Sequence, residues 1–366
     1  MAELCRAALP EIRAIECQLD HDEALGRNRV YLRQAIGEAL WRLQYTGDAD
    51  TAAKAVARVR AISGSPPSIL ATRDEKGSCG VGTDVWFLKL DASVDLMLAD
   101  DFEAGDHPPR FLDLVNHPDR LRNYLTELRL SHLAKDGIDR RKELNFATAD
   151  LVRLILRQRP RGYSWDPRLE NVVRNFVAEW QDPRTGFFGA DYEIDGQRWR
   201  TVDLSMTFHM ARYLDGRIGH WQRLIDTLLA IRDDRYPNGW LDAEGMTSHN
   251  NYDVAVLFSL GWQQLRADQR RRSQQQLDRL LRWCLGTAVT PDGAVAARAV
   301  GEALPESYYF TIAFLDTVGF FNPAKRFWTT AEFPRAAALR AGLEQRVCEL
   351  HPGHPMVPMA LARLRG

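Results

Sequence analysis

Hydrophobic residues recur along this chain with the 3.6-residue period of an α-helix, and the helical segments fall into two alternating kinds. Segments of one kind are amphipathic, with arginine and acidic residues on one side, and are expected to lie on the outside of a core. Segments of the other kind are apolar on most faces, which is typical of buried helices. The outer segments are residues 110–133, 168–180, 221–232 and 274–288, and the inner ones are residues 145–158, 203–214, 251–265 and 306–321.

A turn that contains a glycine separates the two helices of each pair. The turns are KDGID, DPRTGFFG, YPNGWL and TPDGAV, with Gly137, Gly186, Gly239 and Gly293. The nearly equal spacing of these four glycines, within the range of periods that repeat proteins show, indicates a repeat built from helical hairpins.

Further helical patterns extend the repeat toward both ends of the chain. Residues 30–44 and 83–98 have the inner pattern, and residues 50–62 and 333–350 have the outer one. Six inner and six outer helices predict an all-α fold, an (α/α)6 toroid of alternating inner and outer helices. We expect a single domain over residues 1–366, with residues 1–28 and 349–366 as extensions. An open α-solenoid is the alternative, but it has no need of six almost wholly apolar inner helices.

The connections from outer to inner helices are longer than most of the connections back. They are about residues 64–82, 181–200, 233–248 and 288–303. In a toroid these loops would lie at one end, over the N-termini of the inner helices, where free N–H groups and the positive ends of the helix dipoles meet. Because long loops on a rigid scaffold often carry function, we expect the active site at this mouth.

The repeat layout, with a glycine and an aromatic residue ahead of an inner helix, resembles the α/α-toroid enzymes over roughly residues 29–348. These are the six-hairpin glycosidases, the toroidal polysaccharide lyases and, more distantly, the terpenoid cyclase and prenyltransferase toroids. The resemblance implies chemistry in the mouth of the toroid, usually on saccharides, and it assigns no catalytic residue. Neither Asp-x-Asp-Asp nor DDxxD is completed, and Cys284 lies on an outer helix rather than an inner one. Terpenoid chemistry is therefore the weaker interpretation.

The densest group of polar residues is MTSHNNYD, at the start of the fifth inner helix. Its imidazole, amides, phenol and carboxylate suit a hydroxyl-rich ligand, which needs many directional donors and acceptors. The alternative is capping, with Ser248 or Asn250 at the N-cap and Asp253 as a capping-box acid. Two consecutive asparagines and a histidine exceed what capping requires. The predicted site residues of this segment are His249, Asn250, Asn251, Tyr252 and Asp253.

Acidic residues also stand at the start of the inner helices on either side of this one. Asp203 begins the preceding inner helix, and Glu306 follows Pro305 in the last one. Each has an alternative role as a helix cap or first-turn acid. Asp203, Asp253 and Glu306 hold equivalent places in three successive hairpins, so we expect them to converge on one cavity and shift one another's pKa. With His249 they are the predicted catalytic residues.

Aromatic residues on or beside the long loops supply possible contacts for sugar rings. Trp199 is the predicted stacking residue, because an exposed aromatic face packs on the apolar side of a sugar. Tyr309 is a second candidate for binding. Phe187 and Trp240 directly follow turn glycines, which favours a role as plugs that hold the loops down.

Three further residues are predicted to bind substrate. His209 lies among methionine and phenylalanine on its inner helix, so a core histidine is an equally good interpretation. In a lyase, a cation such as Arg200 would neutralise a uronate carboxylate, with His249 or Tyr308 near the abstracted proton.

Both carbohydrate chemistries fit these residues, and hydrolysis is placed slightly ahead. The predicted function is a glycoside hydrolase acting on an oligosaccharide or glycan intermediate by carboxylate acid/base catalysis. The alternatives are a polysaccharide or oligosaccharide lyase with a His or Tyr base, a terpenoid-type cyclase, and a toroid that only binds. The expected partner is a small-molecule or oligosaccharide substrate, and the oligomeric state is left open.

Composition and short motifs limit the partners, compartment and cofactors that we expect for this protein. The net charge of −1, from 48 basic and 49 acidic residues, argues against nucleic-acid binding. No apolar run is long enough for membrane insertion, and acidic residues interrupt the N-terminal stretches, so we expect a cytoplasmic protein. Five cysteines without CxxC spacing fit a reducing compartment, and Cys284 is interpreted as packing. No HExxH motif and no histidine pair at i, i+4 is present, so we predict no metal and no cofactor.

Overall fold

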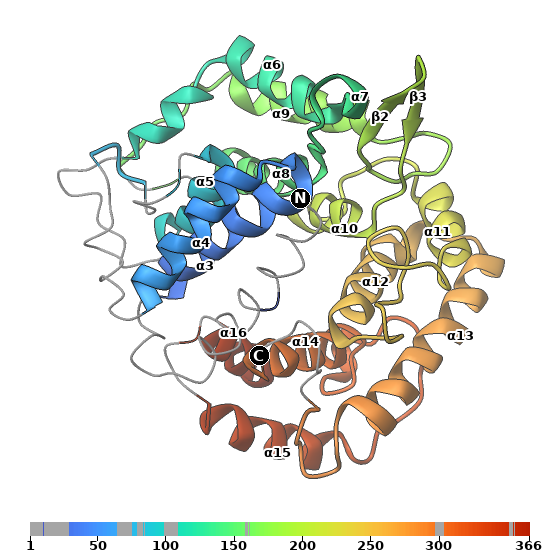
Figure 1. Cartoon of the computed structure of the whole chain (residues 1–366). Helices are drawn as coiled ribbons and strands as arrows, with labels where there is room; N and C mark the ends of the chain where they lie inside the picture. Colours follow the sequence, from blue (N-terminus) through green and yellow to red (C-terminus); the bar gives the residue numbers. More distant parts are fainter. Residues whose placement is uncertain are drawn as a thin grey trace. The chain divides into compact units, whose positions relative to one another are not determined.

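The computed structural model is helical over most of its described residues, which confirms the all-α class, and it contains one small sheet (Figure 1). The chain divides into two compact units. Unit 1 comprises the chain up to Trp180 together with Gly189–Thr201, and unit 2 comprises Gln181–Phe188 and Val202–Gly366. The single domain predicted from the sequence stays a prediction. The structure describes residues 10, 29–63, 75–78, 83, 85–98, 109–157, 160, 162–296, 304–350, 354 and 356–366.

Unit 1 consists of two layers of helices and a short sheet. Helices α3, α5 and α8 are neighbours in one layer; α4 packs on α3, and α6 packs on both α8 and α9. The bounds are α3 Arg29–Trp41, α4 Ala49–Ser63, α5 Trp86–Met97, α6 Pro118–Arg129, α7 Leu133–Asp136, α8 Arg141–Val152 and α9 Leu169–Trp180, with short turns η1 Arg42–Thr46, η3 Arg110–Leu114 and η4 Arg153–Arg157.

The sheet of unit 1 has the strand order β1-β2-β3. Strand β1 (Leu130–Ser131) runs parallel to β2 (Asp191–Ile194), and β2 pairs antiparallel with β3 (Gln197–Arg200). The hairpin of β2 and β3 lies in the segment 181–200, which the sequence predicted as a loop.

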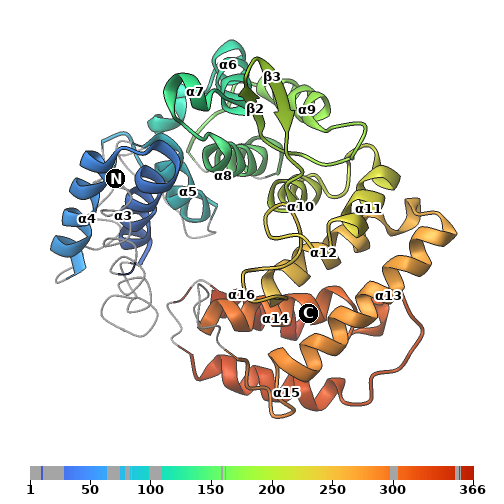
Figure 2. The same cartoon turned by 45° about the vertical axis from the view of Figure 1, so that its right-hand side comes forward.

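Unit 2 repeats the two-layer arrangement. Helices α10, α12, α14 and α16 pack side by side in this order, and α11, α13 and α15 lie along their outer side (Figure 2). The bounds are α10 Leu204–Tyr213, α11 Trp221–Ala230, α12 Ser248–Gly261, α13 Ala267–Trp283, α14 Leu304–Thr317, α15 Ala336–Cys348 and α16 Met356–Arg365, with short turns η5 Trp262–Gln264, η6 Cys284–Ala288 and η7 Pro323–Lys325.

The predicted alternation of outer and inner helices is confirmed within unit 2. On α11, Trp221, Leu224 and Leu228 are buried while Gln222 and Arg223 are exposed, as the helical period requires. On α12, every residue from 250 to 258 is buried, which leaves no solvent face over these turns.

Two helix predictions need correction. The predicted outer helix 110–133 is broken, because Pro118 occupies the first turn of α6 and His117 before it is extended, with φ −155°. The segment 349–366, expected as an extension, contains α16, whose Val357, Ala360 and Leu364 are buried. The expected extension at the other end, 1–28, lies outside the described part except for residue 10.

The turn glycine Gly186 is required by the packing of its loop. Its φ is +74°, and a Cβ atom there would lie 2.4 Å from the backbone nitrogen of Leu224 on α11. Phe187 and Trp240, 1% and 2% exposed, are confirmed as buried plugs. Cys284 is also buried, in agreement with its predicted role in packing. Burial raises the pKa of its thiol to about 12. None of the helices in the described part of the chain has the length and apolar character to cross a membrane.

Candidate functional site

The loop between α11 and α12 ties together the starts of two inner-layer helices of unit 2. The backbone nitrogen of Leu204, the first residue of α10, donates to the carbonyl of Pro237 at 2.7 Å. The side-chain amide of Asn250 donates to the carbonyl of Trp240 at 2.9 Å. Ser248 on α12 and Thr311 on α14 join their hydroxyls at 2.8 Å, which links the second pair of helices.

His249 lies at the centre of a mixed aromatic and acidic cluster at the start of α12. Its ring stacks on Phe310 of α14 with a centroid distance of 4.2 Å, and Tyr236 lies 5.8 Å away. The Nε2 atom is 3.9 Å from a carboxylate oxygen of Asp253. Burial lowers the pKa of His249 to about 4, although the nearby charge of Glu306 acts in the opposite direction. The imidazole is therefore neutral at pH 7, while its side chain keeps 34% exposure.

The three predicted carboxylates occupy different environments. Asp253 is 1% exposed, whereas Glu306, in the first turn of α14, is partly open to solvent. Asp203 is fully buried and caps α10, where its carboxylate accepts from the backbone nitrogen of Met206 at 2.9 Å. The structure thus places Asp253 beside His249, leaves Glu306 near enough for its charge to act on the imidazole, and gives Asp203 a capping function.

The helix starts correct two details of the sequence analysis. The N-cap of α12 is Thr247, whose hydroxyl accepts from the backbone nitrogen of Asn250 at 2.9 Å, so neither Ser248 nor Asn250 fills that position. Asp253 is the sixth residue of α12 and lies beyond the reach of a capping box. The expected equivalence of Asp203, Asp253 and Glu306 is therefore wrong in detail, because the first precedes its helix and the other two lie inside theirs.

The two asparagines have separate surroundings. Asn250 uses its amide on Trp240, as described above. Asn251 is fully buried, and neither its Nδ2 nor its Oδ1 atom has a hydrogen-bond partner among the described residues. A buried side-chain amide normally has at least one hydrogen-bond partner, and among the described residues Asn251 departs from this rule.

A second cluster, which we call the Arg-Tyr cluster, consists of Arg212, Tyr252, Tyr309 and Arg363. A guanidinium nitrogen of Arg363 donates to the Tyr252 hydroxyl at 2.9 Å. Burial raises the pKa of Tyr252 to about 12, although the two arginines lower it. Both tyrosines are among the residues predicted from the sequence, and neither arginine is. Arg363 was assigned to an extension, and nothing in the local pattern of α10 marks Arg212.

The remaining predicted residues of unit 2 lie elsewhere. His209 on α10 stacks on Tyr213 one turn later, with centroids 5.7 Å apart and ring planes 9° apart. Tyr308 is buried, and its hydroxyl accepts from the backbone nitrogen of Val295 at 3.4 Å. This contact gives Tyr308 a structural role, namely holding the connection after α13.

Trp199 and Arg200 belong to strand β3 of unit 1. Trp199 is 58% exposed, as a stacking residue must be. Arg200 binds the buried carboxylate of Asp191 at 2.6 and 3.0 Å, which gives it a structural role instead of a free cation for a ligand.

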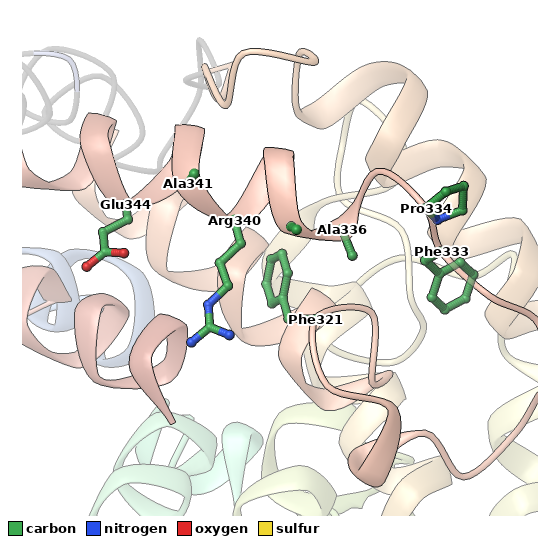
Figure 3. A pocket seen from close by; sticks show the side chains of 8 residues that line it. Phe321, Phe333, Pro334, Ala336, Arg340, Ala341 and Glu344 are labelled. Atoms are coloured by element: carbon green, nitrogen blue, oxygen red, sulfur yellow. The ribbon is translucent and has the colours of Figure 1, made fainter.

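An open cavity of about 380 Å³ lies beside α15 in unit 2 (Figure 3). Six of its eight lining residues are apolar and two are charged, and Figure 3 shows the guanidinium of Arg340 beside the ring of Phe321. No predicted site residue lines this cavity, so we base the candidate site on the His249 cluster. The lining residues are Phe321, Phe333, Pro334, Ala336, Ala337, Arg340, Ala341 and Glu344.

The described residues contain no group of three or more histidine, cysteine and acidic side chains that fits a metal ion. The residues of the His249 cluster, a neutral imidazole and carboxylates beside aromatic faces, are of the types that transfer protons. Comparison of the chain with family models, with curated proteins and with solved structures found no match.

Proposed function

We propose that this protein is a carbohydrate-active enzyme, and specifically a glycoside hydrolase, with its site at the N-terminal ends of α12 and α14. The observation that carries the proposal is the grouping of Asp253 and Glu306 around the imidazole of His249, which lies on Phe310. A saccharide requires directional polar groups beside an apolar ring face, and this cluster offers both.

The different environments of the groups suggest their roles. Hydrolysis needs an acid that protonates the leaving oxygen and a base that activates water. We assign the acid to Glu306, because it is partly open to solvent. We assign the base to the neutral imidazole of His249, with the buried Asp253 as a positioning residue that orients the ring. Asp203, which caps α10, is left out of this assignment.

A β-eliminating lyase is the second candidate, and the neutral state of His249 favours it. In that reaction the imidazole would take a proton from a sugar carbon, and Glu306 would protonate the leaving oxygen, so the product would carry a carbon–carbon double bond.

The proposal includes the closed (α/α)6 toroid expected from the sequence. The alternation of buried and amphipathic helices within unit 2 and the two helix layers of each unit support it. Small-angle X-ray scattering tests closure, because an open solenoid of this length gives a larger radius of gyration than a toroid.

A panel of oligosaccharides with different linkages tests the activity. New reducing ends without an unsaturated product indicate hydrolysis, and an ultraviolet-absorbing unsaturated product indicates elimination. We expect Glu306→Gln to abolish turnover without lowering the melting temperature, and Glu332→Gln, at an 83% exposed side chain, to change neither. Full activity of Glu306→Gln, or the absence of any cleaved saccharide, would refute the proposal.

A further inference from the structure

Two arginines from different helices approach the same buried tyrosine ring in unit 2. The guanidinium carbon of Arg363, on α16, lies 5.3 Å from the centroid of Tyr252, and that of Arg212, on α10, lies 5.9 Å from it. Arg363 also lies 5.7 Å from the ring of Tyr309 on α14. Four inner-layer helices therefore contribute one side chain each to the Arg-Tyr cluster, and both guanidinium groups make cation–π contacts with tyrosine rings.

The carboxylate that binds Arg363 also binds a second cation. Asp316 accepts from Arg363 at 3.1 Å with one oxygen and from Lys325 at 2.7 Å with the other. One carboxylate is thus shared between two cations. Asp316 and the Tyr252 hydroxyl fix the guanidinium in place, while 25% of the Arg363 side chain stays exposed. A fixed and partly exposed guanidinium in such a setting is suited to bind an anion.

The Arg-Tyr cluster is continuous with the candidate site. The ring of Tyr252 lies 6.1 Å from that of Phe310, and Phe310 is the ring on which His249 stacks. Tyr309 also lies beside Phe310, with centroids 5.1 Å apart. Two aromatic rings, that of Tyr252 or Tyr309 and then that of Phe310, therefore connect the arginines to the imidazole of His249.

We propose that Arg212 and Arg363 form an anion subsite that binds an acidic substituent of the ligand, namely a carboxylate, sulfate or phosphate group. That this substituent belongs to a saccharide rests on the proposed function; the anion subsite itself does not. The substrate class is then an acidic saccharide, held by its charge at the Arg-Tyr cluster and by its ring over Phe310. Guanidinium groups recognise each of these anions through paired N–H donors.

Binding measurements with four probes test the subsite without any assay of turnover. Isothermal titration calorimetry of the full chain with glucuronate, inorganic sulfate, inorganic phosphate and uncharged glucose gives the affinities. We expect glucuronate to bind more tightly than glucose, and Arg363→Gln and Arg212→Gln each to weaken glucuronate about ten-fold or more. Arg282→Gln, at a 79% exposed position on α13, is the matched control and should change nothing.

The variants Arg212→Lys and Arg363→Lys distinguish a loss of anion binding from a loss of folding, because each keeps the positive charge and lacks only the paired N–H donors. They should fold as the unaltered chain does and bind glucuronate with intermediate affinity. If no anion binds, or if the Gln variants bind as the unaltered chain does, the subsite is refuted. Tight binding of inorganic phosphate or sulfate without any preference for glucuronate would support the anion subsite and would refute an acidic saccharide as its ligand. Arginine-dependent glucuronate binding by a chain that cleaves no saccharide would support the subsite while the proposed hydrolase fails.

Discussion

His249 shows how packing sets the charge of a single residue. Its ring lies against Phe310, and burial lowers its pKa from 6.5 to about 4. Between these two values the unfolded chain binds a proton at this side chain and the folded protein does not. The free energy of unfolding must therefore fall as the pH is lowered through this window, and this contribution is fully present only above about pH 6.5.

The first prediction follows from this linkage. Between pH 7 and pH 5, the unaltered protein should lose more stability than His249→Gln, because the variant has no imidazole to protonate in the unfolded state. Urea denaturation at both pH values measures the difference. Gln197→Ala, at an exposed position of β3 without a titratable side chain, is the control and should lose as much stability as the unaltered chain. Equal losses in all three proteins would contradict the lowered pKa of the His249 imidazole.

Sequence patterns located part of the candidate site, for reasons that apply residue by residue. His249 and Asp253 lie one helical turn apart, and Glu306 begins the next inner helix, so the repeat itself brings them together. Arg363 reaches Tyr252 across 111 positions of the chain, and no local pattern encodes such a contact. The burial of Asn251 and the capping role of Asp203 likewise depend on neighbours that only the packed structure supplies.

At the scale of elements, the hairpin of β2 and β3 is organised by one buried carboxylate. Asp191 is fully buried and binds Arg129 at 3.0 Å and Arg200 at 2.6 Å, and Arg198 also donates to it. Burial by itself would raise the pKa of Asp191, but the hydrogen bonds and charges of the arginines outweigh it and hold the pKa below its usual value. The strand sequences DYEI and QRWR have no clear apolar face, which is why the sequence predicted a loop here.

The second prediction is that Asp191→Asn strongly destabilises unit 1. The change leaves the partly buried Arg129 and Arg200 without their carboxylate, and breaking a buried ion pair in this way costs about 3–5 kcal/mol. Chemical denaturation measures the loss. Glu193→Gln, two residues along the same strand at a 49% exposed side chain, should cost less than about 1 kcal/mol. A loss for Asp191→Asn as small as that of the control would contradict the role of this carboxylate.

The third prediction separates backbone strain from steric clash at two turn glycines. Gly137 and Gly186 have φ values of +69° and +74°, but a Cβ atom at Gly137 meets nothing within 4 Å. Gly137→Ala should therefore cost only the left-handed strain, about 1–2 kcal/mol. Gly186→Ala adds the clash with the backbone of Leu224 and should cost clearly more. Thermal melts of the two variants measure both losses of stability. Equal losses would show that the loop can move away from α11.

At the scale of the whole molecule, hydrophobic periodicity predicted the helices well and their partners only in part. An inner helix such as α12 is buried throughout its middle, and this is visible in the sequence as an uninterrupted apolar stretch. Helix α16 was missed because its short sequence, MVPMALARLR, includes a proline and two arginines and lies in the segment that was expected to be an extension of the repeat. Its place beside α14 and α15 depends on a narrow stripe of Val357, Ala360 and Leu364.

The last prediction concerns this C-terminal helix. A chain that ends at Leu350 lacks the buried side chains of α16, and each large apolar one contributes about 1–3 kcal/mol to the free energy of unfolding. It also lacks the hydrogen bonds of Arg363 to Tyr252 and Asp316. Hydrogen exchange should therefore accelerate in α14 and α15, the helices that pack on α16, relative to α8 of unit 1. Arg363→Gln in the full-length chain removes only the hydrogen bonds of the guanidinium, so it should accelerate exchange much less than the truncation does. Met359→Ala, at a 42% exposed position, should have little effect on exchange. Unchanged exchange in α14 after truncation would mean that α16 adds little to the stability of unit 2, and that Arg363 is retained for binding rather than for folding.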